Sequence, residues 1–312
     1  MQAEKIVITG GAGLVGQNLL VELAPDPSYD VVVIDNRPAN LAVLRSLFPQ
    51  VKAVQADLAE PGDWSEQFDG AAAVVQLHAQ IGAPTREPFE RNNVLATKNV
   101  LEAIERHHVP YLVHASSSVV VSVADDFYTQ TKREQEEMVV ASGIPNVVLR
   151  PTLMFGWFDR KHLGWLSRFM KRIPVFPIPG RGRFMRQPLY VRDFSRVIAS
   201  ALRQRPVGEI HDITGQDRVD YVDIIRTIRT AVRAKTLLVY IPVPLFGALL
   251  RVWSIFDKNP PFTDQQLRAL VAGDEFETTD WPGRFGVTPT PFATAIDETF
   301  NNPTFADVVL DF

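Results

Sequence analysis

Tyr128 and Lys132 lie four residues apart at the start of a segment, 129–141, whose apolar pattern predicts a helix. That spacing puts both side chains on one face of the helix, one turn apart. A tyrosine hydroxyl with a pKa of about 10 is a weak base at neutral pH, but a neighbouring ammonium group lowers that pKa. The pair therefore indicates a tyrosine that can exchange a proton with a substrate hydroxyl.

A glycine-rich turn with the sequence TGGAGLVG begins at Thr9, much earlier in the chain. Glycine at positions 10 and 13 allows a tight turn and the close approach of a pyrophosphate, which the N–H groups of the following helix would bind. Asp35 follows this turn by roughly 20 residues, where a carboxylate accepts hydrogen bonds from ribose hydroxyls and repels a 2′-phosphate. The sequence thus predicts a bound dinucleotide and favours NAD, although Arg37 leaves NADP as an alternative.

Short β-branched runs alternate with helical patterns over the first half of the chain. Apolar strands separated by helices predict a Rossmann-type, doubly wound parallel α/β sheet with helices on both faces. The predicted strands are Lys5–Thr9, Val31–Ile34, Val51–Gln55, Ala73–Leu77, Tyr111–His114 and Val147–Leu149, and the predicted helices are Val15–Leu23, Leu41–Leu47, Asn93–His107 and Thr129–Ala141. We expect residues 1–155 to form the dinucleotide-binding domain. Residues 156–312 would form a smaller mixed α/β substrate lobe, with 186–205 packing back onto the first domain.

The second half of the chain is less regular. Proline and glycine between Ile173 and Gly182 predict an irregular loop, and Asp220–Arg233 has the apolar spacing of a helix. The apolar stretch Leu237–Phe256 predicts an amphipathic helix that caps a core or lies on a membrane. Prolines and an arginine interrupt this stretch, so no membrane span is expected.

The composition narrows the function classes. Apolar residues make up 46% of the 312 residues, and a net charge of −4 gives no reason to expect a nucleic-acid partner. The chain has no cysteine, so disulfides and thiolate chemistry are excluded, and its six histidines lack metal-ligand spacing, so no metal is expected. The N-terminus does not resemble a signal peptide, and we expect a cytoplasmic protein.

Seven motifs stand in a recognisable order: the glycine turn; Asp57-Leu58; the helix entered at Asn93; the serine run 116–118; Tyr128 with Lys132; Arg150-Pro151; and the segment from Arg186 to Asp193. Together they resemble the extended short-chain dehydrogenase/reductase family, which includes sugar-nucleotide epimerases and dehydratases. The resemblance implies that NAD takes the hydride while Tyr128 takes the proton. Ser118 would stabilise the reacting oxygen.

The resemblance also implies the remaining site residues and the partners. A nucleotide sugar would bind at Ser117, Ser118, Tyr128 and Arg186, with Arg186 meeting its pyrophosphate. The second, C-terminal arginine that family members use for the pyrophosphate has no clear match, and Arg284 is the candidate for it. Because members often dimerise through the helices that here contain Asn93 and Tyr128, a homodimer is implied as well. The implied cofactor contacts are Gly10, Gly13, Leu14, Val15, Asp35, Asn36, Arg37, Asp57, Leu58, Leu77, His78, Ala79, Asn93, Ser116, Tyr128, Lys132 and Pro151.

Three features depart from the family pattern. His78 replaces a small residue that normally lines the cofactor, Val119–Val121 replaces a tyrosine-glycine pair, and Tyr128 follows Ser118 by only ten positions. The missing residues normally form one wall of the substrate pocket. Two alternatives to a nucleotide-sugar enzyme therefore stay open: an NAD(P)-dependent reductase or dehydrogenase of a hydrophobic alcohol or ketone, and a non-catalytic NAD(P)-binding protein.

Overall fold

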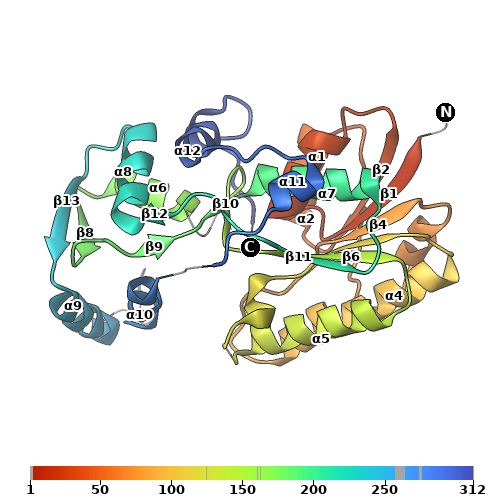
Figure 1. Cartoon of the computed structure of the whole chain (residues 1–312), viewed down its shortest axis with the longest axis horizontal. Helices are drawn as coiled ribbons and strands as arrows, with labels where there is room; N and C mark the ends of the chain where they lie inside the picture. Colours follow the sequence, from red (N-terminus) through yellow and green to blue (C-terminus); the bar gives the residue numbers. More distant parts are fainter. Residues whose placement is uncertain are drawn as a thin grey trace.

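A seven-stranded parallel sheet forms the centre of the computed structural model, which describes residues 3–123, 125–159, 161, 163–256, 264–273 and 276–311. In the strand order β11-β6-β5-β4-β1-β2-β3, β1 is an inner strand, with β2 and β3 on one side and the other four strands on the other side (Figure 1). The strands are β1 (Glu4–Thr9), β2 (Tyr29–Asp35), β3 (Lys52–Gln55), β4 (Ala73–Gln76), β5 (Leu112–Ala115), β6 (Asn146–Pro151) and β11 (Glu209–Ile213).

Helices cover both faces of this sheet, because its apolar side chains alternate between two cores. On β1, Ile6 and Ile8 pack into one core and Val7 packs into the other. The first core lies under α1 (Leu14–Leu23), α2 (Pro38–Leu47) and α7 (Val191–Gln204); the second lies under η1 (Asp63–Phe68), α4 (Ala96–Arg106) and α5 (Phe127–Ala141). The predicted doubly wound α/β fold is confirmed (Figure 1).

The chain returns to the sheet after it has entered the second lobe. α7 packs against α1, and β11 then pairs in parallel with β6 at the edge of the sheet. The sequence analysis did not predict β11. Its sequence, EIHDI, contains three polar residues among five and only Ile213 is fully buried, so it lacks the continuous apolar run of the inner strands. The division of the chain at residue 155 remains a prediction.

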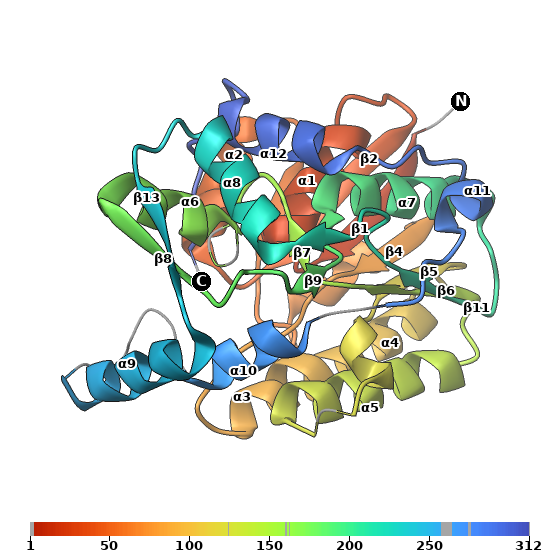
Figure 2. The same cartoon turned by 60° about the vertical axis from the view of Figure 1, so that its left-hand side comes forward.

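The second lobe contains short strand pairs and helices around a core of its own. Ile178, Ile225 and Ile296 are fully buried there and come from a strand and two helices (Figures 1 and 2). Its elements are β7 (Met154–Phe155), α6 (Leu163–Arg172), β8 (Val175–Pro179), β9 (Met185–Arg186), β10 (Leu189–Tyr190), β12 (Val219–Asp220), α8 (Tyr221–Ala231), β13 (Leu237–Ile241), α9 (Val243–Phe256), α10 (Asp264–Ala272) and α12 (Phe292–Asn301). The short helix α11 (Trp281–Phe285) packs into the first core of the sheet.

One prediction for this lobe was wrong and another was confirmed only in part. The expected loop at 173–182 contains β8. The expected helix at 237–256 is confirmed over Val243–Phe256 as α9, but its first residues form β13, which pairs in parallel with β8. Gly180 donates its N–H to the carbonyl oxygen of Ile241 of β13, so Pro179 and Pro177, one and three residues earlier, face the other edge. An edge strand tolerates proline where no N–H is needed, and therefore the prolines did not prevent a strand.

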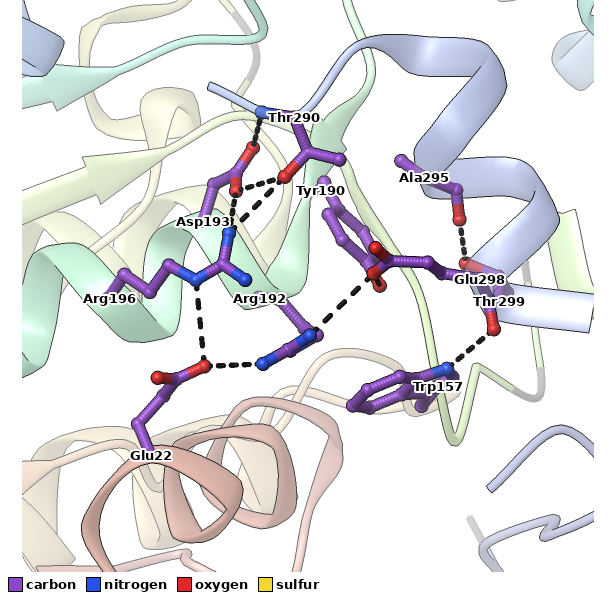
Figure 3. A network of polar contacts seen from close by, with 10 residues as sticks. All are labelled: Glu22, Trp157, Tyr190, Arg192, Asp193, Arg196, Thr290, Ala295, Glu298 and Thr299. Carbon is purple, nitrogen blue, oxygen red and sulfur yellow. Dashed lines mark hydrogen bonds and ion pairs between the residues drawn. The ribbon is translucent and has the colours of Figure 1, made fainter. Parts of the chain in front are cut away.

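A polar network joins the C-terminal helix to the first domain (Figure 3). Arg192 on α7 donates to Glu22 of α1, lies 3.6 Å from the Glu298 carboxylate of α12 and stacks over Trp157. Asp193, the next residue, accepts hydrogen bonds from both the N–H and the hydroxyl of Thr290, at 2.8 and 2.7 Å. The network fixes the approach of α12 to the domain that carries the glycine turn.

We expect Asp193→Asn to lower the free energy of unfolding by about 2–4 kcal/mol, because a buried carboxylate with three partners is replaced by a neutral amide. Asp193 is 3% exposed and also accepts a hydrogen bond from Arg196, three residues along α7. Asp223→Asn is the matched control, since Asp223 pairs with Arg226 at the same spacing on an exposed surface. Urea unfolding should shift for the first variant only; equal midpoints would contradict the role given to this network.

Candidate active site

The glycine turn connects the end of β1 to the start of α1. Gly10 has a φ of +69°, and a Cβ there would lie 2.6 Å from the backbone of His78, so only glycine fits. A Cβ at Gly16 would lie 2.2 Å from the carbonyl oxygen of Gly11, which explains how closely the helix packs on the turn. At Gly13 a Cβ would meet no atom closer than 3.4 Å. The turn therefore has room for a ligand beside Gly13.

The first turn of α1 is suited to an anion. Gly13 is its N-cap and provides no side-chain hydrogen bond, and the first turn contains no acidic residue. The N–H groups at a helix start carry a partial positive charge and bind phosphate when no side chain caps them. The residues present therefore fit the pyrophosphate of a dinucleotide.

Gly13→Ala tests that fit. We expect the variant to lose at least tenfold in NAD affinity, because the methyl group fills the space that the pyrophosphate needs. The structure accommodates the methyl group itself, so the free energy of unfolding should change by less than about 1 kcal/mol. Gly82→Ala is the control, since a Cβ at Gly82 meets nothing within 4 Å. Calorimetric titration that gives equal NAD affinities for both variants would rule out this binding mode.

Asp35 at the end of β2 supports the turn. One carboxylate oxygen accepts the N–H of Ala12 at 3.0 Å, and the other accepts the N–H of Arg37 at 2.9 Å. Burial raises the pKa of this carboxyl group, and the backbone hydrogen bonds oppose the shift. A carboxylate has four lone-pair positions, so this one can still accept from a ribose hydroxyl. Asn36 and Arg37 are exposed beside it.

Beyond β3, an open cavity of about 370 Å³ lies between the strand end and η1. Asp57 and Trp64 line it, and the Asp57 carboxylate accepts hydrogen bonds from the N–H of Ala59 and from Arg91, at 2.9 and 2.8 Å. The cavity lies on the β3 side of Asp35, where the far end of a dinucleotide would extend. Its size suits a base ring.

Tyr128, Lys132 and the serine run lie together where β5 ends and α5 begins. The Asp126 carboxylate caps α5 by accepting the N–H of Thr129 at 2.8 Å, which fixes the first turn of the helix that carries Tyr128. Burial raises the pKa of Tyr128, and a hydrogen bond with the Ser117 side chain opposes the shift. Ser118, the predicted catalytic serine, is the first residue of η3 (Ser118–Val121). The serine hydroxyl paired with Tyr128 is that of Ser117.

Lys132 is almost completely buried, with 1% of its surface exposed. Its ammonium group donates to the carbonyl oxygen of Ala115 at 3.0 Å and to the Gln135 side chain at 2.5 Å. Burial lowers the pKa of Lys132 to about 7, and the negative charge of Glu136 opposes the shift. At neutral pH this lysine therefore exists in both protonation states, which an exposed lysine does not.

A polar cluster that the sequence analysis missed lies behind Lys132. Gln135 and Gln76 each donate to the Thr97 hydroxyl at 2.7 Å, and the His78 ring bonds to Thr97 and to Thr9 at 3.2 and 2.9 Å. Burial lowers the pKa of His78 to about 3, so its ring is neutral. The ring lies between β1 and α4, directed into the interior. The i+3 spacing of Gln135 from Lys132 was the one signal for this cluster in the sequence.

A buried ion pair joins α5 to β6. Glu136 accepts hydrogen bonds from Arg150 on β6 and from the Ser116 hydroxyl. The hydroxyl of Ser116, which is an implied cofactor contact, is therefore hydrogen-bonded to Glu136 of α5. Asn93, another implied contact, is fully buried and bonds to the backbone of Gln80 and to the Thr131 hydroxyl. Both residues position the elements around the site through these contacts.

The other implied contacts lie around the carboxyl ends of the sheet strands. Leu14, Val15, Leu77 and Ala79 are partly exposed or exposed near the turn, Leu58 is buried, and Pro151 ends β6 as a buried residue. Arg186 is half-buried on β9, close enough to Tyr221 for its charge to influence the pKa of that hydroxyl. Arg284, a candidate for a second pyrophosphate ligand, instead pairs with Glu209 at 2.7 Å. Glu209 is the first residue of β11, so Arg284 lies at the amino ends of the parallel strands, whereas the site lies at their carboxyl ends.

Among the described residues, no group of three or more His, Cys, Asp or Glu side chains could hold a metal ion. Within that same part of the chain, no helix is long and apolar enough to cross a membrane.

Comparison with known proteins gives a family and a set of relatives. The profile of the NAD dependent epimerase/dehydratase family matches residues 6–213. A ceramide reductase from Caulobacter vibrioides is 26% identical, with the alignment covering 88% of this chain and 85% of the relative. A dTDP-glucose 4,6-dehydratase from Actinoplanes is 27% identical, covering 68% of this chain and 76% of the relative.

Solved structures support the fold. A UDP-glucuronic acid 4-epimerase from Bacillus cereus, in complex with UDP-glucuronic acid and NAD, superposes with a TM-score of 0.73 at 20% identity. The alignment covers 95% of this chain and 97% of that structure. The second lobe is therefore part of the shared architecture, along with the sheet.

Proposed function

The chain belongs to the NAD-dependent epimerase/dehydratase family, whose members are NAD-dependent enzymes, and from that premise we propose that it transfers a hydride to or from a hydroxyl-bearing carbon of a nucleotide sugar. The pairing of Tyr128 with Ser117 and its position one turn before Lys132 carry this proposal. NAD, when bound at the glycine turn, supplies the hydride acceptor.

In this proposal Tyr128 exchanges the proton of the substrate hydroxyl. Ser117 donates a hydrogen bond to the substrate oxygen, where negative charge develops as the proton leaves. We assign this role to Ser117 in place of Ser118, because Ser117 is the hydrogen-bond partner of Tyr128. Lys132 lies one turn after Tyr128 on α5, and in this proposal its positive charge, when it is protonated, favours the ionised tyrosine during proton transfer.

Arg186 supports a substrate with a diphosphate. Its guanidinium group is suited to bidentate contacts with phosphate oxygens, and the segment 160–192 around it contains no acidic residue. The dTDP-glucose dehydratase among the relatives acts on a substrate of this class. A second arginine for the diphosphate is not supplied by Arg284, which pairs with Glu209.

A second substrate class is favoured by the apolar residues beside the site. Val121, Val123 and Phe127, in the short segment between the serines and Tyr128, are 61%, 105% and 40% exposed. Such a rim suits an apolar alcohol or ketone, and one relative is a ceramide reductase. In a reduction Tyr128 would act as the acid, a role that its raised pKa suits.

One experiment separates the two classes. Purified protein is incubated with NAD and a panel of UDP- and dTDP-sugars, and in parallel with NADH and a long-chain ketone. Conversion of a nucleotide sugar supports the first proposal, whereas NADH consumption with the ketone alone supports the second. If the protein binds NAD but converts no compound of either class, both proposals fail and a non-catalytic role follows.

We also propose a homodimer formed through the α4–α5 face. Leu95 of η2 (Glu90–Leu95) and Val140 of α5 are apolar and 42% and 51% exposed. Light scattering should give twice the monomer mass for the native chain. Val140→Glu should give the monomer mass; a monomeric native chain would contradict the proposal.

A further inference from the structure

Positive charge is concentrated in two segments of this acidic chain. Residues 160–192 contain nine Lys or Arg and residues 224–256 contain five, and neither segment contains a single Asp or Glu. All 36 acidic residues therefore lie outside these segments, although the whole chain has a net charge of −4. The segments include α6, β8 and β9, most of α8, and β13 and α9, which belong to the second lobe.

The cations gather at one end of the β8–β13 pair. Lys171 and Arg172 precede β8, Arg233 and Lys235 precede β13, and all four are exposed. Because the two strands are parallel, with Leu237 opposite Val175, the four cations come from the same end of the pair. This end also presents apolar side chains: Val175 is 44% exposed and Leu237 is 65% exposed.

The apolar surface continues along the chain into α9. Leu245, Leu249 and Val252 are each about half exposed, at 52%, 50% and 53%, and their i, i+4, i+7 spacing places them on one helix face. Phe246 on the other side of the helix is buried. Figures 1 and 2 show β13 and α9 at the end of the molecule farthest from β1 and β2. The α9 stripe and the strand pair with its four cations are called the lobe-end surface below.

We propose that the lobe-end surface binds the surface of an anionic lipid bilayer. Leu237 and Val239, 65% and 42% exposed on one face of β13, run from the four cations toward α9, a helix too short to span a bilayer. Apolar side chains that share a surface with exposed Lys and Arg are the features of a segment that lies in the headgroup region. Each cation near an anionic surface strengthens binding by roughly fivefold. This inference is independent of the substrate, since it uses none of the residues of the active site.

Vesicle sedimentation tests the proposal with the full-length protein. We expect at least tenfold tighter binding to vesicles of phosphatidylcholine with phosphatidylglycerol than to phosphatidylcholine alone. High salt should reverse most of this difference, because exposed charges are screened. Equal binding to both vesicle types, or none to either, would overturn the proposal.

Two sets of variants locate the surface. Leu245→Gln, Leu249→Gln and Val252→Gln combined, or Lys171→Glu, Arg172→Glu, Arg233→Glu and Lys235→Glu combined, should each lower anionic-vesicle binding at least tenfold. The control is Val207→Gln with Ile210→Gln, which changes apolar residues 62% and 43% exposed near β11, and it should bind as the native chain does. Circular dichroism checks that each variant folds. If light scattering instead shows lipid-independent dimers that the α9 variant abolishes, the surface binds a second copy and the membrane proposal is wrong.

Discussion

Tyr128→Phe should reduce kcat about a thousandfold while NAD affinity stays within twofold of the native value. The substitution removes only the hydroxyl that exchanges the proton, and general acid–base groups contribute roughly 10²- to 10⁴-fold. The phenyl ring occupies the same space at the start of α5, so the Asp126 cap is retained. Turnover with the best substrate of the panel gives kcat, and titration gives the NAD affinity.

The control for this variant is Tyr240→Phe. Tyr240 on β13 is 46% exposed and its hydroxyl accepts a hydrogen bond from Arg226, away from the Tyr128 site. Its loss should leave kcat unchanged. If Tyr128→Phe keeps activity within tenfold of the native enzyme, the proton is moved by another group and the mechanism proposed here is wrong.

Lys132→Met should have the second largest effect, a loss of at least a hundredfold in kcat. In the proposed mechanism Lys132, one turn after Tyr128 on α5, supplies the positive charge that the proton transfer needs, and methionine fills its buried space without the charge. Lys98→Met, on the exposed side of α4, is the control and should retain full activity. Full activity of Lys132→Met would show that the Tyr128 pKa is set without this lysine.

The same variant has a pH signature in stability. The pKa of Lys132 falls from 10.5 to about 7 on folding, so between these values the unfolded chain binds more protons than the folded one. Stability therefore rises as pH increases from about 7 toward 10. In this range Lys132 is protonated in the unfolded chain and neutral in the folded one, so a lower proton concentration favours the folded state. Melting temperatures measured without NAD should show this rise in the native protein relative to Lys132→Met. Parallel pH profiles would contradict a buried lysine.

The local patterns of the first domain predicted most of its structure. A continuous apolar run identifies a buried strand, and the glycine spacing identifies the turn, from residues close together in the sequence. β1, β2 and the turn were therefore predicted closely. β8 and β11 were missed, because one contains prolines that only an edge strand tolerates and the other is half polar. Those features depend on which strands pair, which no local pattern specifies.

The sequence predicted which residues form the site more closely than it predicted how they are arranged. Tyr128 and Lys132 share a helix face as their spacing requires, but the choice between Ser117 and Ser118 depends on how η3 turns away from β5. The inward direction of His78 depends on Thr9 and Thr97, which are distant in sequence. Arg284 was a candidate from its residue type, and its partner Glu209 could be identified only from the fold.

The central claim is that a substrate hydride moves to NAD at a site where Tyr128 moves the proton. The direct measurement follows deuterium from the reacting carbon of a labelled nucleotide sugar, or of the alcohol form of the long-chain ketone, into NAD. We predict that mass spectrometry finds label in the cofactor with the native enzyme and almost none with Tyr128→Phe. Label transfer that is equal in both, or absent with every substrate despite NAD binding, would contradict the account.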